Sequence, residues 1–108
     1  MKKIITLSIV ALALASCEKK GNNVKYEVTC AECSLTYSNS SDNTEQGSTT
    51  NGWEYGFDAE PGHFLYISAQ NKRSSGTVTV KILVNGKVKE ESSSSGAYVI
   101  ATASMSMP

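Results

Sequence analysis

Cysteine is the residue type whose chemistry this sequence defines best, and the chain contains three. Cys17 ends the tetrapeptide LASC at residues 14–17, in which an aliphatic residue and two small residues precede the thiol. This order matches the bacterial lipobox. Small side chains let a signal peptidase reach the bond, and the thiol can carry a thioether-linked diacylglycerol. We therefore predict that Cys17 is lipidated and becomes the first residue of the mature chain.

The residues before Cys17 have the order of a secretory signal peptide. Lys2 and Lys3 precede an apolar run at residues 4–14. This run is too short for a transmembrane helix, which needs about 20 apolar residues, and it is typical of a signal peptide. The alternative is that Cys17 is an incidental cysteine beside an ordinary cleavage site.

These features divide the chain into three parts. We predict a signal peptide at residues 1–16, a lipidated cysteine and short tether at 17–23, and a folded domain at 24–108. Apart from the covalent diacylglycerol and acyl lipid, such as palmitate, on Cys17, no cofactor is expected. Stable attachment to a membrane takes about two acyl chains, which a diacylated cysteine supplies.

Cys30 and Cys33 form a Cys-Ala-Glu-Cys motif between two predicted strands. A reactive C-x-x-C pair normally lies at the start of a helix, where the helix dipole lowers the pKa of the thiol, and no helical pattern follows here. A disulfide that closes a strand-to-strand turn fits an oxidising compartment and is favoured over redox exchange. Two free thiols are the remaining alternative.

Catalytic and metal-binding patterns are weak. His63 is the one histidine, so any Ser-His-Asp arrangement would have to use it, and no G-x-S-x-G turn occurs. His63, Met105 and Met107 could join the thiolates in a Cu(I) site, since soft ligands suit Cu(I). The two methionines are explained more simply as one face of the last strand. We predict neither an enzyme nor a metal site.

Trp53, Tyr55 and Phe57 alternate with polar residues and therefore lie on one face of one strand. Exposed, they would form a platform for sugar rings or an apolar ligand. In a small domain with few large side chains, we favour a place in the core. Phe64 and Tyr66 raise the same question on the next strand.

The rest of the chain predicts an all-β domain, an antiparallel and immunoglobulin-like β-sandwich of about seven strands. Pro61-Gly62 and Asn85-Gly86 are turn signals, and the second pair is typical of a type I′ hairpin. The polar residues 38–50 predict a turn and at most one weak strand, and the serines at 92–95 predict another turn. The expected strands are 24–30, 35–37, 53–58, 63–70, 77–84, 87–92 and 97–104.

The charge balance argues against a nucleic-acid partner. The full chain has no formal net charge, and the loss of Lys2 and Lys3 leaves the mature chain at about −2. Nucleic-acid binding calls for a clustered basic face.

The second half of the chain resembles the MmpS-like family of small extracytoplasmic β-sandwich proteins. The resemblance lies in the strand at 76–84, the Asn-Gly-Lys-Val turn at 85–88 and the Gly-Ala-Tyr sequence at 96–98; the opening V-x-Y-x-V pattern at 24–28 is also similar. It implies an accessory protein, which in mycobacteria works beside a lipid- or drug-exporting transporter, and it supplies no catalytic residue. This chain departs from the family in having a lipobox in place of a transmembrane helix, and in lacking cysteines in its last strands.

Together these features predict a non-catalytic lipoprotein of the cell envelope. It would act as an accessory or interaction protein, with a membrane transport complex as one candidate partner. The alternative is a carbohydrate- or lipid-binding module that uses the face with Trp53, Tyr55 and Phe57. The anchor would lie in the cell membrane or the outer membrane, with the domain in the periplasm or at the cell surface.

Overall fold

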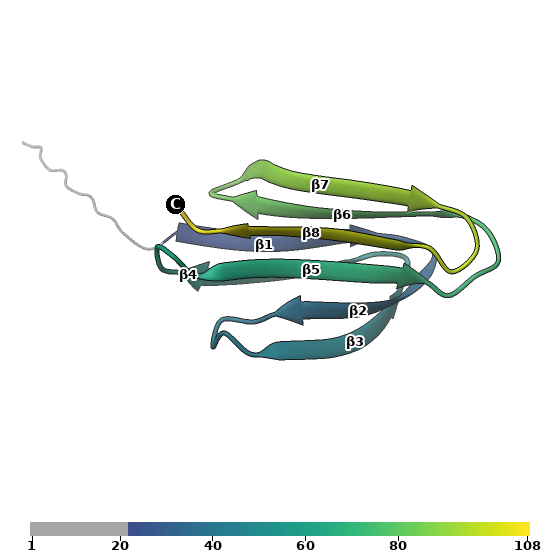
Figure 1. The fold of residues 1–108 in the computed structure, drawn as a ribbon, viewed down its shortest axis with the longest axis horizontal. Helices are drawn as coiled ribbons and strands as arrows, with labels where there is room; N and C mark the ends of the chain where they lie inside the picture. Colours follow the sequence, from purple (N-terminus) through teal and green to yellow (C-terminus); the bar gives the residue numbers. More distant parts are fainter. Residues whose placement is uncertain (1–21) are drawn as a thin grey trace, which may run out of the picture.

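The computed structural model describes residues 22–108, which form eight β-strands in two four-stranded antiparallel sheets packed as a sandwich (Figure 1). Sheet I has the strand order β4-β1-β6-β7, and sheet II has the order β3-β2-β5-β8. The strands are β1 (Asn22–Thr29), β2 (Glu32–Ser38), β3 (Thr44–Thr50), β4 (Trp53–Ala59), β5 (Phe64–Asn71), β6 (Thr77–Val84), β7 (Lys87–Ser95) and β8 (Ile100–Ser106).

The predicted all-β sandwich is confirmed, with eight strands where the sequence predicts about seven. The additional strand is β3, which lies in the polar stretch 38–50. It pairs only with β2, at the edge of sheet II. Six of its seven residues are exposed, so β3 needs no alternation of apolar and polar residues and leaves little signal in the sequence.

The eight strands form two long β-hairpins, each bent so that one half lies in each sheet. In the first hairpin, β2 pairs with β3 in sheet II and β1 pairs with β4 in sheet I. In the second, β5 pairs with β8 in sheet II and β6 pairs with β7 in sheet I. The pairs β1–β6 and β2–β5 join the two hairpins. The strand after His63, β5, is therefore central in its sheet.

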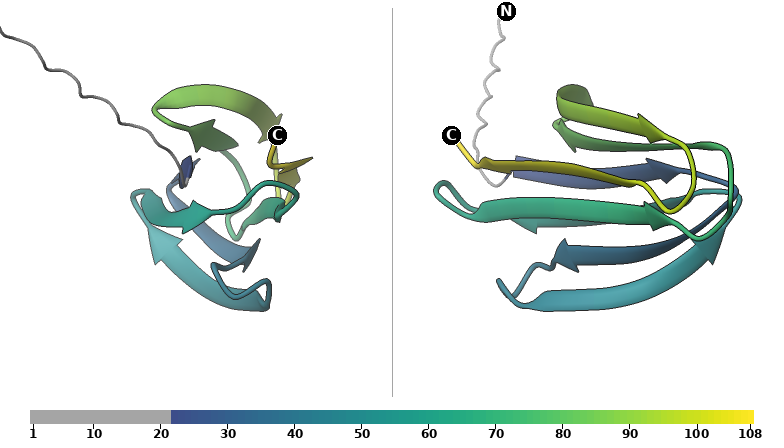
Figure 2. Two further views of the ribbon diagram at one scale, coloured as in Figure 1. Left: turned by 90° about the vertical axis from the view of Figure 1, so that its left-hand side faces the viewer. Right: turned by 45° about the vertical axis from the view of Figure 1, so that its right-hand side comes forward.

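Both hairpins bend at the same end of the sandwich, on the right in Figure 1. The first changes sheets at residues 30–31 and 51–52, and the second at residues 72–76 and 96–99. We call these places the first and second corners. The hairpin tips and both ends of the described chain lie at the opposite end, as the right-hand view in Figure 2 also shows.

The turns at the opposite end have the predicted chemistry. Asn85 and Gly86 have φ angles of 53° and 84°, the two positive values that a type I′ turn requires. Gly62 has a φ of 87°, and the His63 amide donates a hydrogen bond to the Glu60 carbonyl at 3.1 Å. Both turns are therefore confirmed.

The serine-rich segment is strand rather than turn, which corrects the sequence prediction. Residues 92–95 pair with residues 77–80 of β6. Hydroxyl pairs support this pairing, since Thr77 contacts Ser95 and Thr79 contacts Ser93 with Oγ1–Oγ distances of 2.8 Å. The turn falls after Ser95 instead, and the last strand begins at Ile100.

The core forms where alternate residues of the strands face each other between the sheets. The valine and isoleucine side chains at 78, 80, 82 and 84 are at most 5% exposed, because alternate residues of a strand share one face. Leu65 and Ile67 of β5 are fully buried on the facing sheet. Full burial of a side chain of this size stabilises the fold by about 1.5–3 kcal/mol, so this layer holds the two sheets together.

A buried asparagine organises the second corner. Asn71 is 2% exposed, and its Nδ2 donates hydrogen bonds to the carbonyls of Ser75 and Gly96, both at 2.9 Å. Its Oδ1 accepts a bond from the Arg73 amide at 3.0 Å, and its own amide donates to the Val99 carbonyl at 2.8 Å. One side chain thus holds both chain segments that cross between the sheets here.

Candidate functional site

The three aromatic residues singled out in the sequence lie together on β4 and point into the sandwich. Their β1 partners are Val24, Tyr26 and Val28, all buried. Trp53 and Tyr55 stack with their ring centroids 5.9 Å apart and their planes 10° apart, and Tyr55 and Phe57 are separated by 5.4 Å. Phe57 is buried at 9% exposure, whereas Trp53 and Tyr55 are half-buried. The core placement thus applies fully to Phe57 and partly to the other two.

Rings from two other strands complete this aromatic row. Tyr37 of β2 lies with its ring centroid 4.8 Å from that of Trp53 and 5.1 Å from that of Tyr55. Tyr26 of β1 lies 5.5 Å from Phe57. The sequence predicts both tyrosines as strand residues only. Their membership in the row follows from the packing of sheet I on sheet II.

Trp53, Tyr55 and Tyr37 are only half-buried in this row, whereas Tyr26 and Phe57 are buried. The β3 residues paired with the inward side chains of β2 are Glu45, Gly47 and Thr49. A Cβ at Gly47 would have no atom within 4 Å, so this stretch of β3 leaves open space. Trp53 and Tyr55 form an aromatic rim on the edge strand β4, next to Tyr37 of β2, where a ring or an apolar group could stack.

Glu45 affects the nearest tyrosine at this rim. The Tyr37 hydroxyl donates a hydrogen bond to the Glu45 carboxylate at 3.4 Å. Partial burial, followed by the negative charge of Glu45, raises the pKa of Tyr37 above its ordinary value near 10. Tyr37 is therefore neutral at physiological pH and offers the rim an uncharged hydroxyl group.

A buried polar network lies behind the aromatic row and joins the two sheets. The Tyr26 hydroxyl donates to the Ser38 carbonyl at 2.8 Å and accepts from the Tyr66 amide at 3.2 Å. The Ser38 hydroxyl donates to the Phe64 carbonyl at 3.1 Å and also accepts from the Tyr66 amide. These side chains satisfy backbone groups of β5 beyond the last ladder pair between β2 and β5, so we assign them a structural role.

Replacing Tyr26 with phenylalanine is expected to lower the free energy of unfolding by about 1–2 kcal/mol, because buried partners lose their hydrogen bonds.

Burial raises the pKa of Tyr26, although hydrogen bonds from Ser38 and Tyr66 offset part of the effect. The unfolded chain then loses this proton first, so native stability is full below pH ~10 and falls as the pH rises through the folded-state pKa. Urea titrations from pH 8 to 11 should show a shallower alkaline loss in Tyr26→Phe. If the free energy of unfolding fell equally steeply with pH in both proteins, Tyr26 would not be the group responsible.

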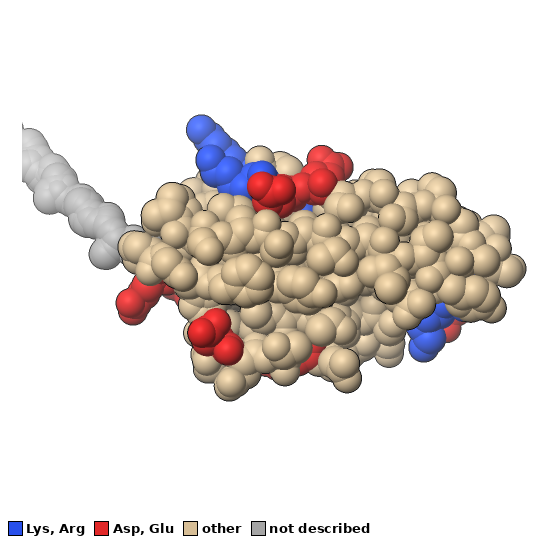
Figure 3. Space-filling model, viewed as in Figure 1, with Lys and Arg blue, Asp and Glu red and all other residues tan. Residues whose placement is uncertain are grey.

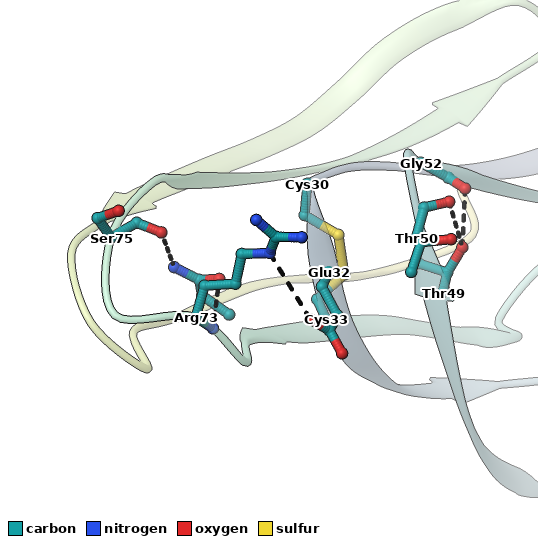
Figure 4. Close-up of a disulfide and its surroundings, with 9 residues drawn as sticks. Cys30, Glu32, Cys33, Thr49, Thr50, Gly52, Arg73 and Ser75 are labelled. Carbon is teal, nitrogen blue, oxygen red and sulfur yellow. Dashed lines mark hydrogen bonds and ion pairs between the residues drawn. A yellow bond between two sulfur atoms is a disulfide. The ribbon is translucent and has the colours of Figure 1, made fainter.

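The structure contains a disulfide between Cys30 and Cys33 at the first corner, with a Cα–Cα distance of 6.3 Å (Figure 4). Cys30 and Cys33 are 6% and 0% exposed, so neither sulfur faces solvent. The other chain segment of this corner, at residues 51–52, is held by a hydrogen bond from the Thr49 hydroxyl to the Gly52 carbonyl at 2.8 Å. This burial favours a structural role over thiol exchange.

Removing this disulfide with the double variant Cys30→Ala/Cys33→Ala is expected to cost about 2 kcal/mol of unfolding free energy, because the closed loop is short. Denaturant titration of the variant and the oxidised protein measures the difference. The buried sulfurs also predict that the native protein resists mild thiol reductants until it begins to unfold. Full reduction without denaturant, at the rate of a model peptide, would refute that.

The metal candidates from the sequence lie in two separate places, because Cys30 and Cys33 are joined at the first corner while His63 and the two methionines lie at the opposite end of the sandwich. Met107 is 3% exposed and its amide donates to the His63 carbonyl at 2.9 Å, while Met105 is partly buried against the core. The His63 ring lies with Nε2 3.2 Å from the Asn39 carbonyl. Within residues 22–108, no three His, Cys, Asp or Glu residues cluster as metal ligands. Cys17 lies outside the described residues.

The most distinctive surface is the outer face of sheet II, which we call the neutral face. The central strand β5 and the edge strand β8 contain no Asp, Glu, Lys or Arg. The two acidic residues of β2 and β3 leave the centre of this face uncharged. Glu45 of β3 is paired with the inward-facing Tyr37, and Glu32 is the first residue of β2, next to the first corner. Figure 3 shows this face as a continuous uncharged surface with the charged groups around its margins. Its outward residues are Ser34, Thr36, Thr44, Gln46, Ser48, Thr50, Phe64, Tyr66, Ser68, Gln70, Ile100, Thr102, Ser104 and Ser106.

The outer face of sheet I has the opposite character. Lys25 lies at its centre and pairs with Glu27 at 3.2 Å and with Glu54 at 3.9 Å. Lys81 and Glu91 are paired across β6 and β7. The lack of charge on β5 and β8 is visible in the sequence, but only the pairing of these strands turns it into one surface.

The fold and these surfaces define the chain as a small all-β domain of two packed sheets with one neutral face. No family model matches the chain, and no curated protein matches it either. Within the described residues, no helix is long and apolar enough to cross a membrane.

Proposed function

We propose that this chain is a lipid-anchored, non-catalytic docking module of the cell envelope. The observation that carries the proposal is the neutral face of sheet II, set against the charged face of sheet I. The lipobox at Cys17 supports the anchor, and the buried disulfide suits an oxidising compartment. In this proposal, the neutral face binds another envelope component while Cys17 holds the domain at the membrane.

The difference between the two faces has a physical meaning. Charged side chains keep an exposed sheet soluble, whereas a charge in the centre of an interface must lose its water at a cost of several kcal/mol unless it is paired. The cores of protein interfaces are accordingly depleted of charged residues. The neutral face has charged residues only at its margin. A partner can therefore cover it without removing water from unpaired charges.

An accessory role beside a membrane transporter is the form of this proposal that the MmpS-like resemblance supports. It rests on the strand and turn patterns in the second half of the sequence. In this form, the transporter would be the component that covers the neutral face.

A photo-crosslinking amino acid on each face tests the proposal in living cells. The matched positions are Thr102 on β8 and Ser93 on β7, because both are exposed, lie on edge strands and pair with a hydroxyl residue on the neighbouring strand. We expect a specific adduct from position 102 that disappears in a Phe64→Ala background. Equal adducts from both positions, or none from position 102, would refute the proposal.

Ligand binding at the aromatic rim is a second candidate, favoured by the half-buried Trp53, whose ring packs beside those of Tyr37 and Tyr55. A sugar or apolar ligand that stacks there should shift the emission of Trp53, the only tryptophan. We expect a saturable shift that Tyr55→Ala weakens by about fivefold, since one aromatic contact contributes about 1 kcal/mol. An unchanged spectrum with ligands that bind the protein would place their site elsewhere.

A further inference from the structure

The neutral face has a local aromatic feature. Phe64 and Tyr66 stack on the outer side of β5, with their ring centroids 6.3 Å apart and their planes 22° apart. Phe64 is 49% exposed, although it lies in a central strand. The rings lie next to Ser106 and Ser104, their partners on β8. Stacked rings at the end of a central strand, of which Phe64 is exposed and Tyr66 half-buried, present an apolar surface to any ligand that lies along the strands.

The rest of the face offers hydrogen bonds without charge. Along β5 and β8, the outward residues beyond the rings include Ser68 and Thr102, whose hydroxyls contact each other at 3.1 Å, and then Gln70. Hydroxyl and amide side chains donate and accept hydrogen bonds. A ligand on this face would therefore meet stacking at one end and neutral polar groups along the remainder.

Apolar ligands fit the face poorly, because its apolar residues are scattered. Phe64 lies at the beginning of β5, while Ile100 lies opposite Gln70 near the end of β5. The two positions are about 20 Å apart at 3.4 Å per residue. A lipid tail needs a contiguous apolar patch, and polar hydroxyl groups fill the distance between these residues.

Charged polymers fit poorly for a different reason. A polyanion requires clustered Lys or Arg, and a polycation requires clustered Asp or Glu. The strands β5 and β8 supply neither. The remaining chemistry is that of an uncharged polyhydroxylated chain, whose ring faces stack on aromatic side chains and whose hydroxyls pair with hydroxyl and amide groups.

We infer that the neutral face binds a neutral polysaccharide, with Phe64 and Tyr66 as the stacking platform and the outward hydroxyl and amide side chains of β5 and β8 as the polar contacts. This inference rests on the proposed docking function and names the class of the docked component. A neutral glycan also predicts that binding is insensitive to ionic strength, because no ion pairs are screened.

Co-sedimentation of the full chain in mild detergent with four insoluble neutral glycans, namely cellulose, chitin, xylan and mannan, tests the inference. We expect saturable binding to at least one of them, equal in 50 and 500 mM NaCl. Phe64→Ala should weaken it by about five- to tenfold, and Thr102→Lys should abolish it. Ser93→Lys, the matched change on the charged sheet, should bind like the unchanged protein, and thermal melts of all three variants check that each is folded.

The outcomes separate this inference from the proposed function. Binding to none of the four glycans, or binding lost in Trp53→Ala but kept in Phe64→Ala, overturns the inference. If a protein is then captured by crosslinking from position 102, docking through the neutral face stands with a protein partner instead. If position 102 also captures nothing, both the inference and the proposed function fail.

Discussion

Asn71→Asp is expected to lower the free energy of unfolding by about 3 kcal/mol or more at neutral pH. The change keeps the size of the side chain but replaces Nδ2, which donates to the carbonyls of Ser75 and Gly96, with an oxygen. Two partly buried carbonyls lose their donor, at about 1–3 kcal/mol each. The new carboxylate would in addition lie against two carbonyl oxygens at a position that is 2% exposed.

This effect should depend on pH in a direction that identifies its cause. Burial beside carbonyl oxygens disfavours the charged carboxylate, so the folded-state pKa of the new aspartate is raised above its unfolded value near 4. The penalty is therefore largest at neutral pH and decreases as the pH falls, because the protonated carboxyl can donate one hydrogen bond again. The second lost bond is not restored.

Urea unfolding of both proteins at pH 7 and pH 4 measures this prediction. Asn43→Asp in the exposed tip of the first hairpin is the matched control and should change stability by less than about 0.5 kcal/mol. A penalty for Asn71→Asp that is small, or that is the same at both pH values, would show that the second corner does not depend on this side chain.

Cys17→Ser is expected to transfer the protein completely from the membrane fraction to the soluble fraction. Serine has no thiol to form the thioether with diacylglycerol, so the variant would lose the acyl chains that make attachment stable, at about 0.8 kcal/mol per buried methylene. The sandwich should remain folded, because the described strands begin at Asn22.

Fractionation and metabolic labelling with a palmitate analogue measure this change. Ser16→Gly keeps a small residue before the cysteine, so this variant should still be labelled and should sediment with membranes. A Cys17→Ser protein that stays in the membrane fraction and carries the label would refute the anchor. Release of both variants would point to a processing defect unrelated to the thiol.

The sequence predicted most of the strands, because burial on one side of a sheet imposes a period of two. The strands that contain Val24 and Val80 alternate in this way, and their apolar faces are buried in the core. Turn chemistry is also local, since positive φ favours Gly and Asn, so the turn at Asn85 was predictable. β3 was only weakly predicted, because an exposed edge strand buries no face.

The serines at 92–95 show how tertiary context overrides local preference. Serine runs favour turns, but here β6 supplies a complete ladder of partners and hydroxyl contacts, as between Thr79 and Ser93. The composition of the aromatic row also depends on tertiary packing. Three of its rings are predictable from one strand, whereas Tyr37 joins them only because the two sheets pack face to face.

By itself, the sequence determined the β-class of the domain, its tight turns, the common face of Trp53, Tyr55 and Phe57, and the lipobox from which an anchor is predicted. These properties depend on residues that are close along the chain. Only the tertiary structure decided that each hairpin bends between sheets, that Asn71 holds the second corner, and that β5 and β8 lie side by side as a neutral face. These features depend on contacts between residues far apart in the sequence, which local periodicity does not encode.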